Sequence, residues 1–296
     1  MTARVIDGKK IAEEIKGELK TEVERLKTKY SLTPGLATVL VGDDPASHVY
    51  VNLKIKNCEN LGIASFNYQL PASTSQEELL GLIHKLNINP AVHGILVQVP
   101  LPKQIDETEV LLAIDPKKDV DGFHPCSLGK MMIGEDTFLS CTPAGIQELL
   151  IRSNIKTEGR HVVVVGRSNI VGKPIANILV QKNSFANATV TICHSQTPDI
   201  GSFTRQADIL IVVIGVPGFI KADMVKEGAT VVDVGTNQIG TTSTGKAKLT
   251  GDVSFEEVSK KAGAITPSPG GVGPMTIAML MVNTIKAAKL SIGLKP

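Results

Sequence analysis

The sequence lacks the features that mark nucleic-acid-binding and membrane proteins. Its 296 residues carry a formal net charge of only +2, and the lysines are scattered rather than gathered in a basic stripe. The longest apolar runs, such as ADILIVVIGVPGFI (207–220), contain glycine and proline and are too short to cross a bilayer. The N-terminal segment alternates in charge like a surface helix and has no apolar core of the signal-peptide kind. We therefore expect a cytoplasmic protein with no nucleic-acid and no membrane partner.

Cysteine is sparse, and its placement does not suggest a disulfide framework. Cys58, Cys126, Cys141 and Cys193 lie far apart in the sequence and include no CxxC pair. Such spacing is typical of free thiols in a reducing compartment, so we expect no metal site. Disulfides or a metal centre are the alternatives.

What the chain does contain is an alternation of apolar runs and helix-like stretches, which is typical of α/β proteins. In the first half, ATVLVG (37–42), ASFNYQL and GILVQVPLP are predicted strands. Two predicted helices lie between them, one from about Ser47 to Leu61 with Gly62 placed to end it, and one in SQEELLGLIHKLN. This order predicts a parallel sheet covered by helices on both faces.

The second half predicts a further series of parallel strands, formed by VVVVG, TVTICH, ILIVVIG and TVVDVG. A helix at TPAGIQELLIRS (142–153) precedes them, with Thr142 as its N-cap and Pro143 at its first position. The segment PSPGGVGPMT (267–276) then leads to an apolar helix that opens near Met275. Its backbone either permits close approach of a ligand or is a plain connection. Two α/β domains are expected, with a boundary near residues 140–150.

The segment HVVVVGRSNIVGKP (161–174) has the form of a dinucleotide-binding strand–turn–helix unit. Gly166 provides the sharp turn, and Gly172 lets the following helix lie close to the sheet. The N–H groups at the start of that helix are suited to receiving a phosphate. The segment departs from the usual G-x-G-x-x-G pattern, because Arg167 and Ser168 follow the first glycine.

The end of the next strand indicates which dinucleotide fits. An NAD site places Asp or Glu there to hold the ribose 2′-hydroxyl, whereas TVTICHSQT offers His194, Ser195 and Gln196. Together with Arg167 and Ser168, these residues supply hydrogen-bond donors and positive charge for the 2′-phosphate of NADP. We therefore expect NADP as the cofactor. The alternative is that Arg167 is a solvated turn residue.

A tyrosine and a lysine share one face of the predicted helix that follows the strand ATVLVG (37–42). Tyr50 and Lys54 are spaced i, i+4 in YVNLKIKNC, so one lies above the other. Because the helix follows a strand, its first turns lie at the carboxyl edge of the sheet, where ligands bind. Lys54 is a candidate for proton transfer, and Tyr50 offers a flat surface to an aromatic ligand. The alternative is a lysine that extends to solvent beside a packing tyrosine.

Polar residues further along the chain add to this candidate site. Gln98 is the one amide in the apolar run GILVQVPLP, and a buried amide requires a hydrogen-bond partner. The loop KKDVDGFHP supplies Asp119 and Asp121, with Gly122 allowing a turn. An aspartate there suits the N–H donors of a pterin-like ring. A satisfied core glutamine and turn-forming aspartates are the alternatives.

Five motifs in this order resemble the bifunctional methylenetetrahydrofolate dehydrogenase/cyclohydrolase family, of the FolD type. They are PASHVYVNLKIKNCENLGI, GILVQVPLP, KKDVDGFHP, GRSNIVGKP and PSPGGVGPMT, and the resemblance runs from about residue 4 to residue 290. It implies a two-domain α/β fold, with an N-terminal α/β folate-binding domain and a C-terminal Rossmann-type doubly wound parallel sheet. The folate domain is expected over residues 1–143, with the C-terminal helix 275–296 packing back on it, and the NADP domain over 144–274. A homodimer through the Rossmann domains is also implied.

The resemblance also implies a reaction and its place in metabolism. Family members oxidise 5,10-methylenetetrahydrofolate to the 5,10-methenyl cation by hydride transfer to NADP. They then hydrolyse that cation to 10-formyltetrahydrofolate. The implied partners are therefore one-carbon derivatives of tetrahydrofolate, and the implied setting is one-carbon metabolism and purine biosynthesis.

The same motifs carry the family's site residues to positions in this sequence. Lys54 matches the catalytic lysine of the hydrolysis step, and Gln98 matches the partner that orients it. Tyr50 matches the tyrosine that stacks on folate, and Asp121 matches the carboxylate that grips the pterin. The implied cofactor contacts are Gly166, Arg167, Ser168, Ser195 and Thr236, and the loop beside the folate includes Gly273 and Pro274.

Three other interpretations compete with this one. Another two-domain NADP dehydrogenase, acting on a shikimate-like hydroxyl substrate, would also use a lysine but would need neither Tyr50 nor Gln98. A non-catalytic NADP sensor would leave Lys54, Gln98 and Asp121 unexplained. A monofunctional member of the same family would keep only one of the two activities.

Overall fold

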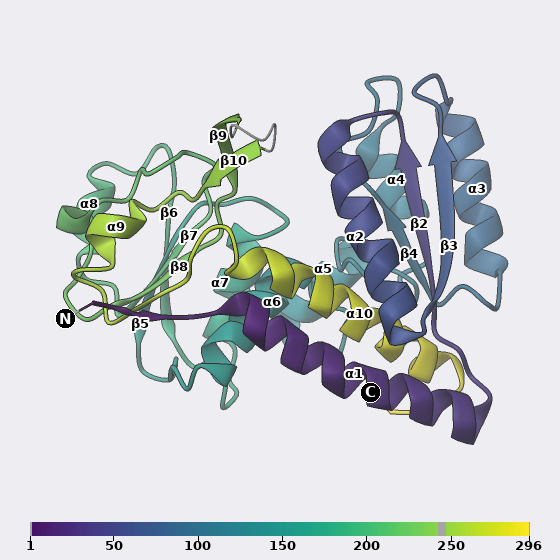
Figure 1. Ribbon diagram of the computed structural model, residues 1–296, viewed down its shortest axis with the longest axis horizontal. Coiled ribbons are helices and arrows are strands. Elements are labelled where there is room, and N and C mark those ends of the chain that lie inside the picture. The colour runs from purple at the N-terminus through teal and green to yellow at the C-terminus, as the bar shows by residue number, and fades with distance from the viewer. Residues whose placement is uncertain (1, 242–246, 296) are drawn as a thin grey trace. The chain divides into compact units, whose positions relative to one another are not determined.

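The computed structural model describes residues 2–241 and 247–295 (Figure 1), so the end points 1 and 296 of the expected domains lie outside it. The chain divides into two compact units, neither of which is a continuous stretch of sequence. Unit 1 comprises Met1–Glu13 and Thr142–Thr276, and unit 2 comprises Glu14–Cys141 and Ile277–Pro296.

The first residues of the chain therefore belong with the Rossmann-type unit and not with the 1–143 domain expected from the sequence. The physical reason is strand β1 (Arg4–Val5), which pairs in parallel with β11 (Ala264–Ile265). Backbone hydrogen bonds from Arg4 to Gly263 and from Ile6 to Ile265 fix this pairing, at 2.9 and 2.8 Å. Helix α1 (Gly8–Tyr30) follows and has the alternating charge pattern predicted for it.

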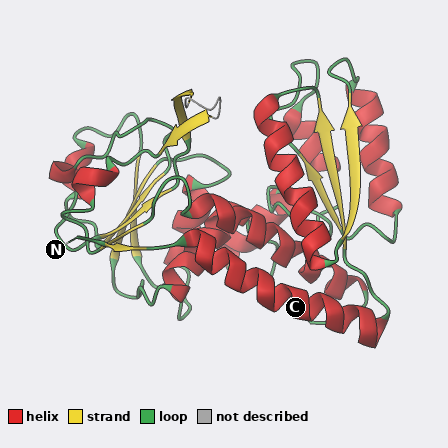
Figure 2. Ribbon diagram, viewed as in Figure 1, coloured by secondary structure: helices red, strands yellow, loops and turns green. Residues whose placement is uncertain are grey.

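Unit 2 is built on a three-stranded parallel sheet with the order β3-β2-β4, flanked by helices as the sequence predicts (Figure 2). Every residue of the central strand β2 is buried. Its alternate side chains Ala37, Val39 and Val41 belong to one apolar core with Leu79 and Ile83 of helix α3. The elements of unit 2 are most of α1, then β2 (Gly35–Val41), α2 (Pro45–Leu61), β3 (Ala64–Leu70), α3 (Gln76–Ile88), β4 (Gly94–Val97), α4 (Glu107–Ala113) and α5 (Pro125–Ile133), and most of the C-terminal helix α10 (Val272–Ser291).

Helix α2 carries the tyrosine and the lysine of the candidate site, and both of its ends are set by local chemistry. Its start lies at Pro45, earlier than the predicted Ser47, because the Asp44 carboxylate accepts a hydrogen bond from the Ser47 N–H at 2.8 Å and caps the helix. Its end is as predicted, since Gly62 adopts φ 72° and its N–H bonds back to the last turn. The helix therefore runs without interruption through Tyr50 and Lys54.

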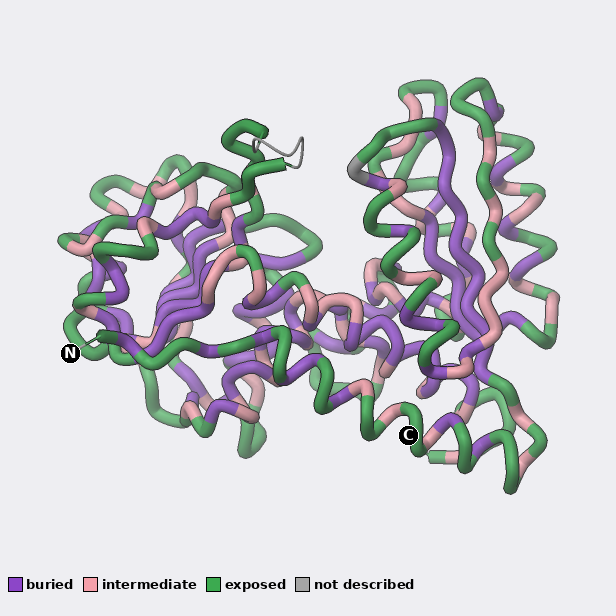
Figure 3. The backbone as a smooth tube through the Cα atoms, viewed as in Figure 1, coloured by how far each residue is buried: buried purple, intermediate pink, exposed green. Residues whose placement is uncertain are grey.

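Unit 1 is built on a six-stranded sheet with the order β1-β11-β8-β7-β5-β6, in which every pair is parallel. Its central strands form an almost solvent-free core, visible as the purple ladder in Figure 3. This is the Rossmann-type doubly wound parallel sheet expected from the sequence. The elements of unit 1 after β1 are α6 (Cys141–Arg152), β5 (His161–Val165), α7 (Gly172–Val180), β6 (Thr189–Cys193), α8 (Ile200–Thr204), β7 (Ile209–Val212), η1 (Ala222–Met224), β8 (Thr230–Asp233), β9 (Asn237–Thr241), β10 (Ala247–Thr250), α9 (Phe255–Val258) and β11, before α10 (Val272–Ser291).

Several boundaries differ from the predicted ones. Helix α6 begins at Cys141, so Thr142 lies inside the helix and is not its N-cap; its hydroxyl instead meets that of Thr276 at 2.9 Å. Helix α10 begins at Val272 rather than near Met275, because a proline in the first turn of a helix sacrifices no hydrogen bond. The antiparallel hairpin of β9 and β10 was not predicted. Among residues 2–241 and 247–295, no helix has the length and apolar character needed to span a membrane.

Candidate active site

Lys54 of α2 and Gln98 are joined by a hydrogen bond. The lysine Nζ donates to Gln98 Oε1 at 2.9 Å, and Gln98 Nε2 donates to the Val99 carbonyl at 2.7 Å. Both polar ends of the amide are therefore partnered, as a half-buried glutamine requires. The amide fixes the position of the lysine head group rather than merely filling a core position.

The sequence predicted that Gln98 lies within a strand. In the structure it lies just beyond the end of strand β4. The strand ends at Val97, and the Gln98 N–H makes one further bond to the Val39 carbonyl at 2.8 Å. The prolines that follow in the run lack the N–H groups needed to continue a ladder. As a result, the first side chain after the strand is free to turn toward α2 at the carboxyl edge of the sheet.

Asp121 is the third polar group of this site. It interacts electrostatically with Lys54 and with the Cys141 thiol. The loop is held on both sides of Asp121: the Asn283 side chain donates to the Val120 carbonyl at 2.8 Å, and Gly122 adopts φ 72°. A Cβ on Gly122 would lie 2.6 Å from the backbone of Leu139, so only glycine fits there.

Burial shifts the titration of these groups toward their neutral forms. Lys54 and Asp121 each keep part of their surface exposed. Burial of the amine nevertheless lowers the pKa of Lys54, and the charge of Asp121 only partly opposes this decrease. Burial likewise raises the pKa of Asp121, against the opposing effect of Lys54. An amine whose pKa is lowered toward neutrality is able to accept and return a proton. The arrangement is that of a general acid–base site.

The neighbouring aspartate of the same loop has a different environment. Asp119 is buried, and its carboxylate accepts from the backbone N–H of His124 at 2.9 Å and from the Ser127 hydroxyl at 2.7 Å. These bonds hold the turn into α5, as expected for a turn-forming aspartate. The two aspartates therefore have different roles, since Asp121 interacts with the lysine and Asp119 stabilises the loop.

Tyr50 lies one turn before Lys54 on α2 and remains 46% exposed. An aromatic ring that packed only within the protein core would be more deeply buried. Its position leaves the ring accessible for stacking against a flat ligand.

The glycine turn after β5 has the close backbone approaches predicted from the sequence. Gly166 adopts φ 130°, and a Cβ there would lie 2.2 Å from the Val213 carbonyl oxygen. A Cβ on Gly172 would lie 2.4 Å from the Gly166 carbonyl oxygen. The Ser168 hydroxyl accepts from the N–H groups of Val171 and Gly172, both at 3.2 Å, and so shapes the turn into α7.

The cationic and polar side chains expected to contact the cofactor are exposed at the carboxyl edge of this sheet. Within the described residues, neither Arg167 nor Ser195 makes a hydrogen bond or ion pair, and Thr236 is exposed after β8. The segment after β6 is organised by His194, whose ring nitrogen accepts from the Gln196 N–H at 3.2 Å. A glycine cradle followed by an unengaged guanidinium and hydroxyl suits the phosphates of NADP.

Gly273 and Pro274 lie in the first turn of α10 and belong to unit 1. No atom of the described residues lies within 4 Å of a Cβ built on Gly273, so packing against them does not require a glycine there. Among the described residues, no group of three or more His, Cys, Asp and Glu side chains is arranged to hold a metal ion.

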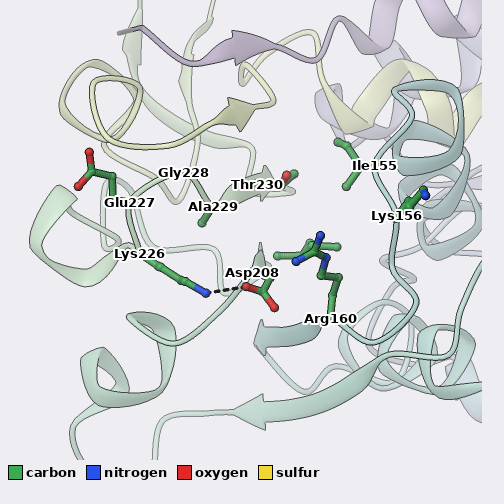
Figure 4. Close-up of a pocket in the computed structure, with 10 residues that line it drawn as sticks. Ile155, Lys156, Arg160, Asp208, Lys226, Glu227, Gly228, Ala229 and Thr230 are labelled. Carbon is green, nitrogen blue, oxygen red and sulfur yellow. Dashed lines mark hydrogen bonds and ion pairs between the residues drawn. The ribbon is translucent and has the colours of Figure 1, made fainter.

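A pocket of about 250 Å³ in unit 1 is lined by residues at the amino ends of the sheet strands, opposite to the carboxyl ends where the cofactor is expected (Figure 4). Lys156, Arg160 and Asp208 line it together with the first residues of β7 and β8. Lys226 Nζ contacts the Asp208 carboxylate at 2.6 Å, and this hydrogen bond lowers the pKa of Asp208. Because α/β sheets bind their ligands at the carboxyl ends of the strands, we do not assign the cofactor to this pocket.

Two residues near Asp121 were not identified from the sequence as parts of the site. Burial raises the pKa of the Cys141 thiol well above its usual range, and its Sγ donates to the Val120 carbonyl at 3.4 Å. Asn283 bonds the carbonyls of Val120 and Leu139. The signal for Asn283 was an amide within the apolar helix MTIAMLMVNTIKAAKL, the same signal that identified Gln98.

Comparison with known proteins agrees with this architecture. Two family models match, described as tetrahydrofolate dehydrogenase/cyclohydrolase, NAD(P)-binding domain (residues 140–292) and catalytic domain (residues 6–121). Bifunctional protein FolD of Dehalococcoides mccartyi is 63% identical over 294 residues, which is 99% of each chain. The solved bifunctional FolD of Campylobacter jejuni is 49% identical, with a TM-score of 0.92 over 97% of this chain and 99% of that one. The FolD of Trypanosoma brucei, solved in complex with NADP cofactor and an inhibitor, is 39% identical, with a TM-score of 0.93 over 99% of both chains. This chain belongs to the tetrahydrofolate dehydrogenase/cyclohydrolase family.

Proposed function

We propose that this protein is a bifunctional enzyme of one-carbon folate metabolism. It oxidises 5,10-methylenetetrahydrofolate to 5,10-methenyltetrahydrofolate with NADP, and it hydrolyses the product to 10-formyltetrahydrofolate. The observation that supports the second activity most directly is the bond from Lys54 to Gln98 at 2.9 Å, beside a carboxylate and in a position that lowers the lysine pKa. Full-length similarity to proteins named bifunctional FolD supports the pairing of the two activities.

The hydrolysis step requires movement of protons rather than strong activation of the substrate. Water adds to the cationic one-carbon bridge, one proton leaves the added water, and a ring C–N bond then breaks to give the formyl group. Lys54 in its neutral form accepts the first proton from the added water and, once protonated, returns it to the departing nitrogen, while the remaining O–H proton leaves to solvent as the C–N bond breaks and the carbonyl forms. Gln98 holds the amine in place, and Asp121 binds the N–H groups of the pterin.

The oxidation step requires alignment more than acid–base chemistry. NADP, when bound, supplies the hydride acceptor, while the protein binds and orients it. Gly166 and the start of α7 receive the phosphates, and Arg167, Ser168 and Ser195 bind the 2′-phosphate through charge-assisted hydrogen bonds. Thr236 contacts the cofactor from the segment after β8. For the folate, Tyr50 provides the stacking surface, and Gly273 and Pro274 keep the folate-loop role that the family resemblance implies.

We propose a homodimer formed through unit 1, because the edge strand β6 leaves Ile192 39% exposed and Phe185 nearby is 53% exposed. We also propose that the enzyme works in the cytoplasm and that its formyl product serves purine biosynthesis. Residues 1–143 and helix 275–296 would serve the folate and residues 144–274 the cofactor, apart from the N-terminal segment assigned above to unit 1.

A spectrophotometric time course with methylenetetrahydrofolate and either NADP or NAD tests the function. Reduced cofactor and methenyl-folate are followed separately in wild type, Lys54→Met and the control Lys56→Met, an exposed lysine of the same helix. We expect reduction with NADP, and hydrolysis slower by about 10³-fold in Lys54→Met but unchanged in Lys56→Met. Methenyl-folate that decays only at its uncatalysed rate in wild type would leave a monofunctional dehydrogenase. If neither cofactor supported turnover, the proposed enzymatic function would be excluded.

A further inference from the structure

The cofactor edge of unit 1 is formed by segments whose backbone must be held in place. From β5 the chain moves to β6 on one side and then to β7 on the other, so the segments after β5 and β7 diverge. Ligands of such sheets bind where the strand order reverses. The Gly166 turn lies directly against the Val213 carbonyl, where a Cβ would come within 2.2 Å. The segment after β7 is therefore one wall of this site.

A buried carboxylate holds that wall. Asp252 has no exposed surface, and its Oδ2 accepts from the N–H groups of Ile214 and Gly215 at 2.7 and 3.0 Å. Its Oδ1 accepts from the Asn237 side-chain amide at 2.8 Å. One carboxylate thus ties the segment after β7 to the segment after β8, next to Thr236.

A second carboxylate fixes the backbone of the first. Asp233, at the end of β8, accepts from the N–H groups of Gly235, Asp252 and Val253 at 3.0, 2.9 and 3.0 Å. A Cβ on Gly251 would lie 1.7 Å from Asp233 Oδ2, and a Cβ on Gly235 would lie 2.2 Å from Asp252 Cγ. The two glycines are required because both carboxylates approach the backbone this closely.

This arrangement is a costly way to stabilise a fold. Among the described residues, neither Asp233 nor Asp252 forms an ion pair, so both depend on N–H donors within the protein. Burying an unpaired carboxylate costs several kcal/mol unless hydrogen bonds offset the cost. Apolar side chains of similar volume usually stabilise a fold at least equally well. What such a network provides beyond stability is one defined position for each backbone segment it contacts.

We propose that Asp252 is a positioning residue of the cofactor site, acting through Ile214, Gly215 and Asn237. The inference rests on the proposed NADP-dependent function and deepens it. Asp252 itself touches neither substrate nor cofactor. It holds the walls that follow β7 and β8 at the spacing that the cofactor requires.

The test compares Asp252→Ala with Asp252→Asn in the full-length enzyme. Asp252→Ala removes all three acceptor contacts, so we expect the KM for NADP to rise about tenfold or more. Asp252→Asn keeps a carbonyl for Ile214 and Gly215, and a rotated Asn237 amide pairs with its NH₂ group, so we expect a KM within about threefold of wild type. Hydrolysis of added methenyl-folate, measured per folded protein, should remain within about twofold in both variants because Lys54 is untouched.

The matched control is Asp208→Ala, in the same unit but at the opposite edge of the sheet. Asp208 also accepts a backbone N–H, from His161 at 3.0 Å, so its loss destabilises unit 1 without touching the cofactor edge. A wild-type KM for NADP in Asp252→Ala would overturn the proposal. So would an equal rise of KM in Asp252→Ala and Asp208→Ala, because that would indicate general loosening of the unit.

A milder variant covers the case in which Asp252→Ala does not fold. Asn237→Ala removes only the link to the segment after β8, and we expect the KM for NADP to rise about threefold. An unchanged KM in Asn237→Ala would then overturn the proposal. Failure of the proposed function looks different, since wild-type enzyme itself would show no NADP-dependent turnover.

Discussion

The carboxyl edges of the two sheets are prepared in different ways. In unit 2, side chains that follow the strands contact one another: Lys54 bonds Gln98, and Asp121 lies beside the lysine. In unit 1, Arg167 and Ser195 are exposed, whereas close-packed glycines shape the turn after β5 and buried aspartates fix the segments after β7 and β8. Unit 2 thus presents reactive side chains, and unit 1 presents a shaped backbone.

This difference follows from where each reaction takes its reactive group. Hydrolysis draws its proton carrier from the protein, so the amine must be positioned and its pKa lowered before the substrate binds. Hydride transfer draws its acceptor from a cofactor, so the protein needs chiefly to hold that molecule in one orientation. Substitutions at the two edges should therefore separate the two activities.

The largest expected effect comes from filling the backbone cradle of unit 1. In Gly166→Ala, the new Cβ collides with the Val213 carbonyl and the residue must keep φ 130°. We expect NADP-dependent oxidation to fall more than about 100-fold and the free energy of unfolding to fall by about 3 kcal/mol. Kinetics with NADP and chemical denaturation measure the two effects.

Gly159→Ala is the matched control for this variant. Gly159 also has positive φ, 69°, but nothing lies within 4 Å of its Cβ position. We expect a loss of only about 1 kcal/mol from backbone strain and unchanged kinetics. Equal losses of activity in the two variants would mean that the close approach to Val213 has no special role.

The next largest effect should come from releasing the lysine of unit 2. In Gln98→Ala, Lys54 loses its acceptor, and we expect hydrolysis to fall about 30-fold while the KM for NADP is unchanged. An acceptor stabilises the charged amine more than the neutral one, so its loss lowers the pKa of Lys54 further. The rising limb of the pH–rate profile should therefore move to lower pH.

Gln104→Ala controls for loss of an amide in unit 2. The Gln104 amide bonds the carbonyls of Ala72 and Thr74, and these bonds share no partner with those of Lys54 and Gln98. We expect its hydrolysis rate and pH profile to match wild type. If Gln98→Ala kept the wild-type profile, the orienting role of Gln98 would be lost.

The smallest effect should come from the exposed cation of unit 1. Arg167→Ala removes a charge-assisted hydrogen bond to the 2′-phosphate, so we expect the KM for NADP to rise about tenfold with no change for NAD. Because Arg167 is exposed, the melting temperature should stay the same. Lys182→Ala, another exposed cation of the same unit, is the control. Equal effects on NADP and NAD would show that Arg167 does not recognise the 2′-phosphate.

Much of this arrangement could be predicted because it depends on local signals. Gly62 marked the end of α2, and the helical spacing of apolar residues in SQEELLGLIHKLN marked α3. The spacing of Tyr50 and Lys54 placed both on one helical face, and the unusual amide of Gln98 marked it as needing a partner. Each of these features is encoded within a few residues.

The features that were missed depend on residues far apart in the chain. Strand β1 contributes only Arg4 and Val5, and nothing in that dipeptide indicates that it pairs with β11. The contact of Asn283 with the Asp121 loop joins positions 163 residues apart. Asp252 was not singled out from the sequence, because its role appears only when three separate segments meet. Periodicity and turn chemistry carry no information on such pairings.

The interleaving of the two units along the chain has a consequence for how the molecule assembles. Each unit recruits a segment that lies beyond the other in sequence: residues 1–13 complete the first, and residues from Ile277 onward complete the second. Closing so long a loop adds little to the entropy cost at equilibrium, since that cost grows only with the logarithm of length. It does delay the closing contacts during folding, because non-local pairings form slowly. Until β1 pairs with it, β11 is an open sheet edge on which other strands can pair incorrectly. We therefore expect either half of this enzyme to misfold or aggregate when it is expressed alone.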